Sequence, residues 1–147
     1  MISIVIPTYN NLDYLKLCIK SLNINSRYNH EIIFHINDGS DGTKEFIKNS
    51  GYKFTHSDIN IGLCSAINKA AKLASFNYIL YSHDDMYFCP DWDDVLIKEV
   101  KSINHENYYL SGTMIEANSG HIVYNFGDTV NNFRENELLS KYKEINF

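Results

Sequence analysis

Short apolar runs alternate with amphipathic segments along the first hundred residues. The apolar runs are rich in β-branched and aromatic residues, and we expect strands at 2–6, 31–36, 53–56 and 76–82. Between them, apolar residues recur every three or four positions, which predicts helices that begin near residues 12, 43, 62 and 91. The run at 76–82 is the central feature, and we expect it to be a buried strand.

The remainder of the chain predicts two strands and one more helix. Residues 108–117 and 121–126 should be strands joined by a hairpin turn at Asn118-Ser119-Gly120, and residues 134–143 are weakly helical. Strands that alternate with helices predict an α/β fold, with a mostly parallel central sheet covered by helices on both faces. At 147 residues, one domain is expected.

Polar clusters follow three of the predicted strands, at residues 7–11, 37–42 and 83–90. In parallel sheets, ligands bind beyond the carboxyl ends of the strands. The sequence therefore predicts a binding site that these three loops form together.

The third cluster contains His83-Asp84-Asp85 directly after the predicted central strand. Two adjacent carboxylates are costly to bury there, because like charges and desolvation both raise the carboxyl pKa. A divalent cation removes that cost, and hard oxygen ligands suit magnesium or manganese. The alternative is a solvated turn that caps the next helix, although Pro90-Asp91 already supplies a helix start. His83 is expected to hydrogen-bond the turn.

The other two clusters suggest a nucleotide. A turn explains Gly39 but does not require Asp38, which can accept a hydrogen bond from a nucleobase N–H. Tyr9 can stack on a base, although Pro7 to Asn11 also reads as a strand end followed by a helix cap. The dinucleotide fingerprint and the P-loop motif are both absent from the sequence.

Composition narrows the class of protein. The net charge is −5 and the 13 Lys and Arg residues are dispersed, so no nucleic-acid partner is expected. The three cysteines form no CxxC pair, which argues against a zinc site or a disulfide framework. No apolar run approaches the length of a transmembrane segment, and a cytoplasmic protein is expected.

Taken together, these motifs resemble family-2 glycosyltransferases of the GT-A fold. The resemblance rests on SIVIPTYNNLDYLKLCIKSL, HEIIFHINDGSDGT and NIGLCSAINKAAKLASFNYILYSHDDMYFCPDWDDVL, in that order. It covers residues 1–126, and residues 127–147 form a short C-terminal extension, so the C-terminal part is compact or truncated. The family moves a sugar from a nucleoside-diphosphate sugar to an acceptor glycan or another hydroxyl compound, and the resemblance implies a metal-dependent transfer with inversion at the anomeric carbon.

The resemblance implies roles for the predicted site residues. Pro7, Thr8 and Tyr9 would line the nucleobase pocket. Asp38 would accept the N3 hydrogen of a uracil or thymine ring, which favours a UDP- or TDP-linked donor. Asn37 stands where the family often has a first Asp.

The resemblance also implies a metal site with a DXD-like motif. Asp85 would bind Mn²⁺ or Mg²⁺ directly, and Asp84 would lie near the ribose or the metal. Ile67 stands where the family often has an Arg that binds the diphosphate. The catalytic base is unknown, with Asp128 and Glu135 as candidates by position only.

Alternatives remain open at the level of the sequence. The chain could be a nucleotide-sugar-binding module or fragment without a complete catalytic site, or a non-enzymatic interaction domain on the same fold. Nucleotidyl transfer is a further option, but a basic phosphate-binding loop is missing. An exposed sheet edge would allow a homo-oligomer.

Overall fold

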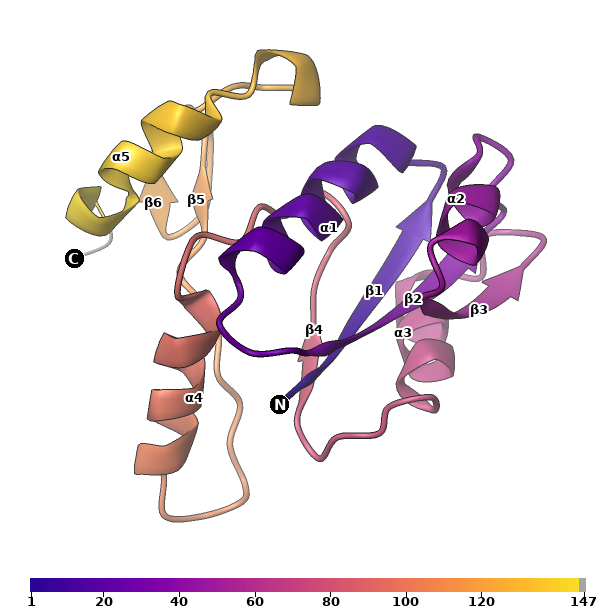
Figure 1. Ribbon diagram of the computed structural model, residues 1–147, viewed down its shortest axis with the longest axis horizontal. Coiled ribbons are helices and arrows are strands. Elements are labelled where there is room, and N and C mark those ends of the chain that lie inside the picture. Colours follow the sequence, from indigo (N-terminus) through magenta and orange to yellow (C-terminus); the bar gives the residue numbers. More distant parts are fainter. Residues whose placement is uncertain (146–147) are drawn as a thin grey trace. The chain divides into compact units, whose positions relative to one another are not determined.

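The computed structural model describes residues 1–145 of the chain (Figure 1). Its contacts divide the chain into two compact units, Met1–Phe88 and Cys89–Phe147. The expectation of a single domain over residues 1–147 stays a prediction. Each unit is described by itself below.

The first unit is a parallel sheet with helices on both faces. Its strands are β1 (Ser3–Tyr9), β2 (Glu31–Asn37), β3 (Lys53–Ser57) and β4 (Ile79–Tyr81). Its helices are α1 (Leu12–Asn25), α2 (Thr43–Asn49) and α3 (Leu63–Ala71). The strand order is β3-β2-β1-β4 with every neighbouring pair parallel, and α1 and α3 lie on opposite faces (Figure 1). The predicted α/β architecture is confirmed.

The core lies around the two middle strands. Val5 of β1 and Ile33 of β2 are fully buried and pack against Ala70 of α3. On α1, the inward-facing apolar residues Leu15 and Leu22 are buried as well. Strands covered on both faces carry continuous apolar runs, which explains why β1 and β2 were recognisable from the sequence.

The prediction that 76–82 is a buried central strand is wrong. β4 has three residues, pairs only with β1 and stands at the edge of the sheet. Ile79 is 51% exposed and Tyr81 is 39% exposed. An edge strand is covered less than a middle strand, and aromatic and branched residues favour both positions alike.

A polar network ties the strands together at the amino end of the sheet. Glu31 of β2 accepts hydrogen bonds from the Ser3 hydroxyl, from Lys53 of β3, and from the backbone and hydroxyl of Ser75. Burial alone would raise the pKa of Glu31, but the bonds from Lys53 and the two serines lower it to about 2.

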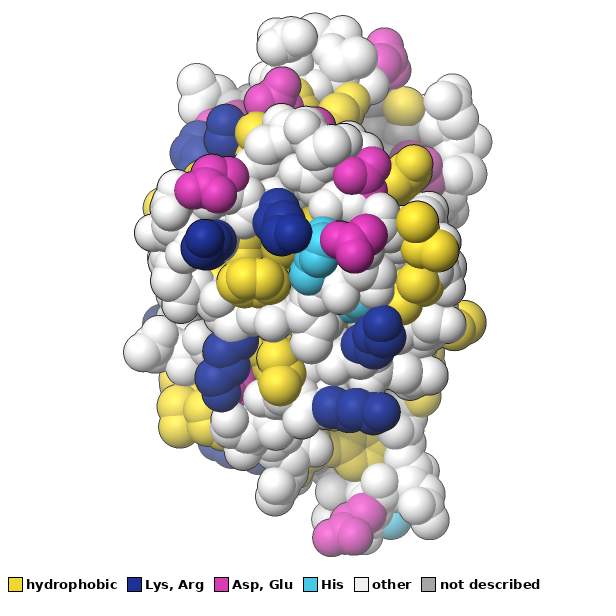
Figure 2. Space-filling model, turned by 90° about the vertical axis from the view of Figure 1, so that its right-hand side faces the viewer, with side chains coloured by type: hydrophobic (Ala, Val, Ile, Leu, Met, Phe, Trp, Pro, Cys, Tyr) yellow, Lys and Arg dark blue, Asp and Glu magenta, His cyan; other side chains and the backbone are white. Residues whose placement is uncertain are grey.

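On the face seen in Figure 2, basic side chains are mixed with acidic and hydrophobic ones.

The second unit contains short elements. They are α4 (Trp92–Ser102), β5 (Ile115–Glu116), β6 (Ile122–Val123), the 3₁₀ turn η1 (Val130–Asn132) and α5 (Glu135–Ile145). Among residues 1–145, no helix combines the length and the apolar character that crossing a membrane requires.

The predicted hairpin in this unit is wrong. β5 and β6 have two residues each and pair in parallel, although a single antiparallel bridge joins Ile115 to Gly120. The polar turn does reverse the chain. The backbone N–H groups of His121 and Ile122 then both donate to the Met114 carbonyl, and the chain changes direction a second time there. The sequence signals the first turn and not the second.

Candidate functional site

The carboxyl ends of β1 and β2 open onto a cavity of about 230 Å³ in the first unit. Its lining comes from the end of β1 and the loop after it, from the end of β2, from the loop before α3 and the start of that helix, and from the loop after β4. The residues are Pro7, Thr8, Tyr9, Asn11, Asn37, Asn60, Leu63 and Asp84. Four of the residues predicted for the site, namely Pro7, Thr8, Tyr9 and Asp84, therefore lie together.

Asp38 lies beside this cavity, and Asn10 holds it. The Asn10 amide nitrogen donates to Asp38 Oδ2 over 2.9 Å, and the Gly39 N–H donates to Asn10 Oδ1 over 2.9 Å. Both Asn10 and Asp38 have positive φ, at 47° and 58°. The Asn10 hydrogen bond, with help from Ser40, holds the pKa of Asp38 below its ordinary value. Asp38 is thus a fixed, ionised hydrogen-bond acceptor.

Three further contacts fix the loop after β2. Asp41 accepts hydrogen bonds from the backbone N–H groups of Leu12 and Thr43, which joins the starts of α1 and α2. His56 Nε2 lies 2.8 Å from the Asp38 carbonyl oxygen. The loop is therefore held from both neighbouring strands.

Asp84 is half-buried, and its side-chain hydrogen bonds come from neutral groups. Its Oδ1 accepts a 3.1 Å hydrogen bond from the Asn11 amide. Burial raises the pKa of Asp84, and the neighbouring Asp85 carboxylate adds to the rise. Burial raises the pKa of the Cys18 thiol to about 12, and the negative charges of Asp84 and Asp85 add to this rise. Asp84 and Asp85 are therefore two adjacent carboxylates, of which Asp84 is half-buried and Asp85 is exposed.

The oxygen atoms of Asp84 and Asp85 fit a hard cation whose remaining ligands come from water or a bound substrate. The Thr8 hydroxyl is buried next to Asp84, and together with the Asn11 amide it offsets part of the rise in the Asp84 pKa. Within residues 1–145, no three His, Cys, Asp or Glu side chains gather closely enough to hold a metal ion by themselves. Two carboxylates without a third protein ligand suit magnesium or manganese, which keep waters and substrate phosphates in their coordination shell.

His83 hydrogen-bonds the chain next to the pair, as expected. Its Nε2 lies 2.7 Å from the Tyr81 hydroxyl, and its carbonyl accepts a hydrogen bond from the Ser82 hydroxyl. These contacts engage the His83 ring and carbonyl within the same stretch of the chain.

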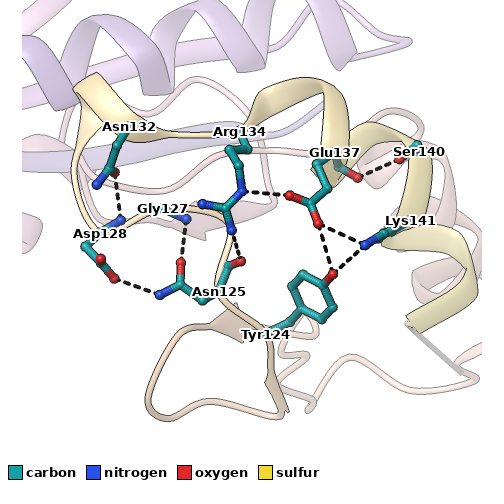
Figure 3. Close-up of polar contacts among 9 residues, drawn as sticks. All are labelled: Tyr124, Asn125, Gly127, Asp128, Asn132, Arg134, Glu137, Ser140 and Lys141. Carbon is teal, nitrogen blue, oxygen red and sulfur yellow. Dashed lines mark hydrogen bonds and ion pairs between the residues drawn. The ribbon is translucent and has the colours of Figure 1, made fainter.

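The two candidates for a catalytic base lie in the second unit. Asp128 accepts a hydrogen bond from the Asn125 amide over 2.9 Å (Figure 3). The Asn132 side chain in turn accepts from the Asp128 backbone N–H over 2.8 Å, which fixes this turn. Glu135 is the first residue of α5. Asp128 is thus held in a turn, and Glu135 stands at the start of a helix.

Glu137 is a charged residue of the second unit that the sequence analysis did not single out. It accepts hydrogen bonds from Lys141, Arg134 and Tyr124, which together lower its pKa to about 2 (Figure 3). The spacing to Arg134 and Lys141 is that of helical ion pairs, which is the signal that could have identified it. Glu137 is held ionised and paired, so it is a poor proton acceptor.

A parallel sheet with a cavity and an acidic pair at its carboxyl edge is typical of the GT-A type of α/β fold. The profile of Glycosyl transferase family 2 matches residues 3–146, and the chain belongs to this family. Poly-beta-1,6-N-acetyl-D-glucosamine synthase of Staphylococcus epidermidis is 30% identical over 105 residues, which are 68% of this chain and 25% of that protein.

Three solved structures of two proteins share the fold. Residues 1–349 of TarS from S. aureus superpose with a TM-score of 0.62 at 18% identity, over 75% of this chain and 38% of that one. The same TarS fragment in complex with UDP gives a TM-score of 0.56. The mannosyltransferase PcManGT from Pyrobaculum calidifontis, in complex with GDP-Man and Mn²⁺, gives 0.56 at 16% identity, over 64% of this chain and 30% of that one. The chain thus spans well under half of these proteins.

Proposed function

We propose that this chain carries the donor site of a metal-dependent glycosyltransferase. The donor is a UDP- or TDP-linked sugar, and the sugar is transferred to an acceptor hydroxyl with inversion. The observation that carries the proposal is the convergence of Thr8, Asn11 and Asp84 on one cavity, with the ionised Asp38 beside it.

The nucleoside half of the proposal rests on the loops after β1 and β2. Pro7, Thr8 and Tyr9 line the cavity, and Tyr9 offers a half-exposed ring on which a base can stack. Asp38 accepts the N3 hydrogen of uracil or thymine. A carboxylate has about four lone-pair sites, so Asp38 can accept this bond while it keeps the one from Asn10.

The diphosphate half rests on the acidic pair. Asp85 and Asp84 would hold Mn²⁺ or Mg²⁺ together with diphosphate oxygens, and the ion would neutralise charge on the leaving diphosphate. The raised pKa of Asp84 supports this assignment, because a bound cation relieves the repulsion between the two carboxylates. The mannosyltransferase of the same fold that holds Mn²⁺ and GDP-Man supports it further.

The reaction exchanges one bond at the anomeric carbon for another. The bond from the anomeric carbon to the diphosphate oxygen breaks, the acceptor oxygen bonds to that carbon, and a base takes the acceptor proton. Asp128 and Glu135 remain the candidates for this base. Glu137 is a weaker choice, because its pKa of about 2 opposes proton uptake.

Asp85→Ala tests the metal assignment. We expect the variant to lose the gain in UDP affinity that Mn²⁺ gives to the wild-type chain, a loss of about tenfold or more, or about 1.4 kcal/mol. The measurement is titration calorimetry with UDP in Mn²⁺ and in EDTA. Asp85 is exposed, so its removal should leave the fold intact.

Asp58→Asn is the matched control for this experiment. Asp58 is almost fully exposed at the end of β3 and does not line the cavity. It should bind UDP as the wild type does, with the same gain from Mn²⁺. An unchanged Mn²⁺-dependent gain in Asp85→Ala would contradict the proposed metal site.

A binding module without a complete catalytic site is the second candidate function. The chain spans 25% of the synthase and 38% of the TarS fragment, which favours a division in which other residues complete the acceptor side. Release of free sugar or transfer to an acceptor by this chain alone would contradict the module. Donor binding without either reaction would support it.

A further inference from the structure

We propose that a polar row on α1, made of Cys18, Ser21 and Asn25, positions the loop that presents Asp84 and Asp85. This inference rests on the proposed function, because it assigns the row to the metal-binding loop. The three residues are positioning residues, since they contact the loop backbone and not the carboxylates.

The row contacts the loop at both of its ends. At the start, the Cys18 thiol lies 3.8 Å from the His83 carbonyl oxygen and donates to it. At the far end, the Phe88 N–H donates to the Ser21 hydroxyl over 3.0 Å, and the Asn25 amide donates to the Phe88 carbonyl over 2.7 Å. The acidic pair lies between these two anchor points.

The spacing of the row places all three side chains on one face of α1. Residues three and four apart are neighbours on a helix surface, and 18, 21 and 25 follow this spacing. Cys18 and Ser21 are fully buried. The Ser21 hydroxyl also donates to the Cys18 carbonyl over 2.8 Å, so its oxygen is fixed as the acceptor for the Phe88 N–H. Movement of the loop would give up its hydrogen bonds to the row, which makes the docked loop the favoured state.

The loop needs such an anchor because its own structure is irregular. Residues 83–88 contain one turn and no helix or strand. The Asp84 and Asp85 carboxylates repel each other, which favours an opened loop unless the backbone is held. The Asn25 amide also donates to the Tyr87 hydroxyl over 3.3 Å, so one side chain restrains two successive residues.

Asn25→Asp is the principal test. It keeps the size of the side chain but replaces the donor to the Phe88 carbonyl with an acceptor. We expect the Mn²⁺-dependent gain in UDP affinity to fall about fivefold or more, while UDP affinity in EDTA stays within about twofold of wild type. The readout is calorimetry with UDP, with Mn²⁺ and with EDTA.

Asn23→Asp is the matched control on the same helix. Asn23 is exposed and donates to the Tyr52 hydroxyl, away from the loop. Both variants add one negative charge, which alone would strengthen cation binding. A loss confined to Asn25→Asp therefore reports the missing hydrogen bond.

Ser21→Ala supplies a second readout that needs no metal. In the wild type, the Phe88 amide should exchange its hydrogen slowly, and in Ser21→Ala it should exchange about tenfold faster or more, while the Leu22 amide of α1 exchanges at the wild-type rate. A general loss of stability would accelerate both amides. Unchanged exchange at Phe88 would contradict the inference.

The outcomes separate the two proposals. If the wild type gains no UDP affinity from Mn²⁺, the proposed metal-dependent function fails. If the wild type gains and Asn25→Asp gains equally, the positioning role of the row fails and the function stands.

Discussion

At the residue scale, the site depends on amides as much as on carboxylates. The sequence identified Asp38 and Asp84 because a carboxylate at the end of an apolar strand needs an explanation. It did not identify Asn10 and Asn11 as their partners, because an asparagine before a helix is already explained as a cap. The partner of each carboxylate depends on which loops meet, and only the folded chain fixes this.

Glu31 gives a pH-dependent prediction at the same scale. Its pKa is about 2 in the folded chain and near 4.5 when unfolded, so its contribution to stability is present above about pH 4.5 and is lost as the pH falls toward 2. Glu31→Gln should lower the free energy of unfolding at pH 7 by about 1–2 kcal/mol after allowance for solvent screening. The difference from wild type should shrink toward pH 3.

Urea unfolding at pH 7, 4 and 3 measures this difference. Glu45→Gln is the control, because Glu45 is exposed on α2 and accepts a hydrogen bond from the neutral Asn49 amide. A stability gap for Glu31→Gln that does not change with pH would contradict the network as the cause.

At the element scale, the sequence predicted best where burial is complete. β2 and the helices α1 and α3 follow their patterns, because both sides of the sheet are covered there. β1 was recognised as well, but it runs through Pro7 to Tyr9, beyond the end predicted at Ile6. The strand predicted at 76–82 was longer than β4, and the hairpin predicted in the second unit was wrong. Edge strands and two-residue pairs depend on contacts that no local pattern records.

The loop between β2 and α2 gives a prediction for an element boundary. Gly39 has φ +84°, and a Cβ there would lie 2.8 Å from Ile36 Cγ2 and from Lys44 Cβ. Gly39→Ala should therefore lower the free energy of unfolding by more than about 2 kcal/mol, from backbone strain and overpacking together.

Gly51→Ala is the matched comparison. Gly51 has φ +75°, but a Cβ there meets nothing within 4 Å. It should cost only about 1 kcal/mol, which is the strain alone. Denaturant unfolding of both variants measures the difference, and equal losses would contradict the close approach at Gly39.

At the scale of the whole molecule, the residues proposed for the donor and the candidates for the base belong to different units. Every residue assigned to the donor lies within Met1–Phe88, whereas both candidates for the base lie within Cys89–Phe147. The sequence predicted the α/β fold and the donor loops, because parallel topology brings strand ends to one edge. It did not predict the acceptor side, since a base is defined by its distance from a bound substrate and not by a local pattern.

The central claim is a metal-dependent nucleotide-sugar site, and a thermal-shift panel tests it most directly. The panel compares UDP-, TDP-, GDP- and CMP-linked sugars, each with Mn²⁺ and with EDTA. A ligand that binds only the folded state raises the melting temperature by mass action. We predict a Mn²⁺-dependent rise with a uridine or thymidine donor. A flat panel with every donor would contradict the account.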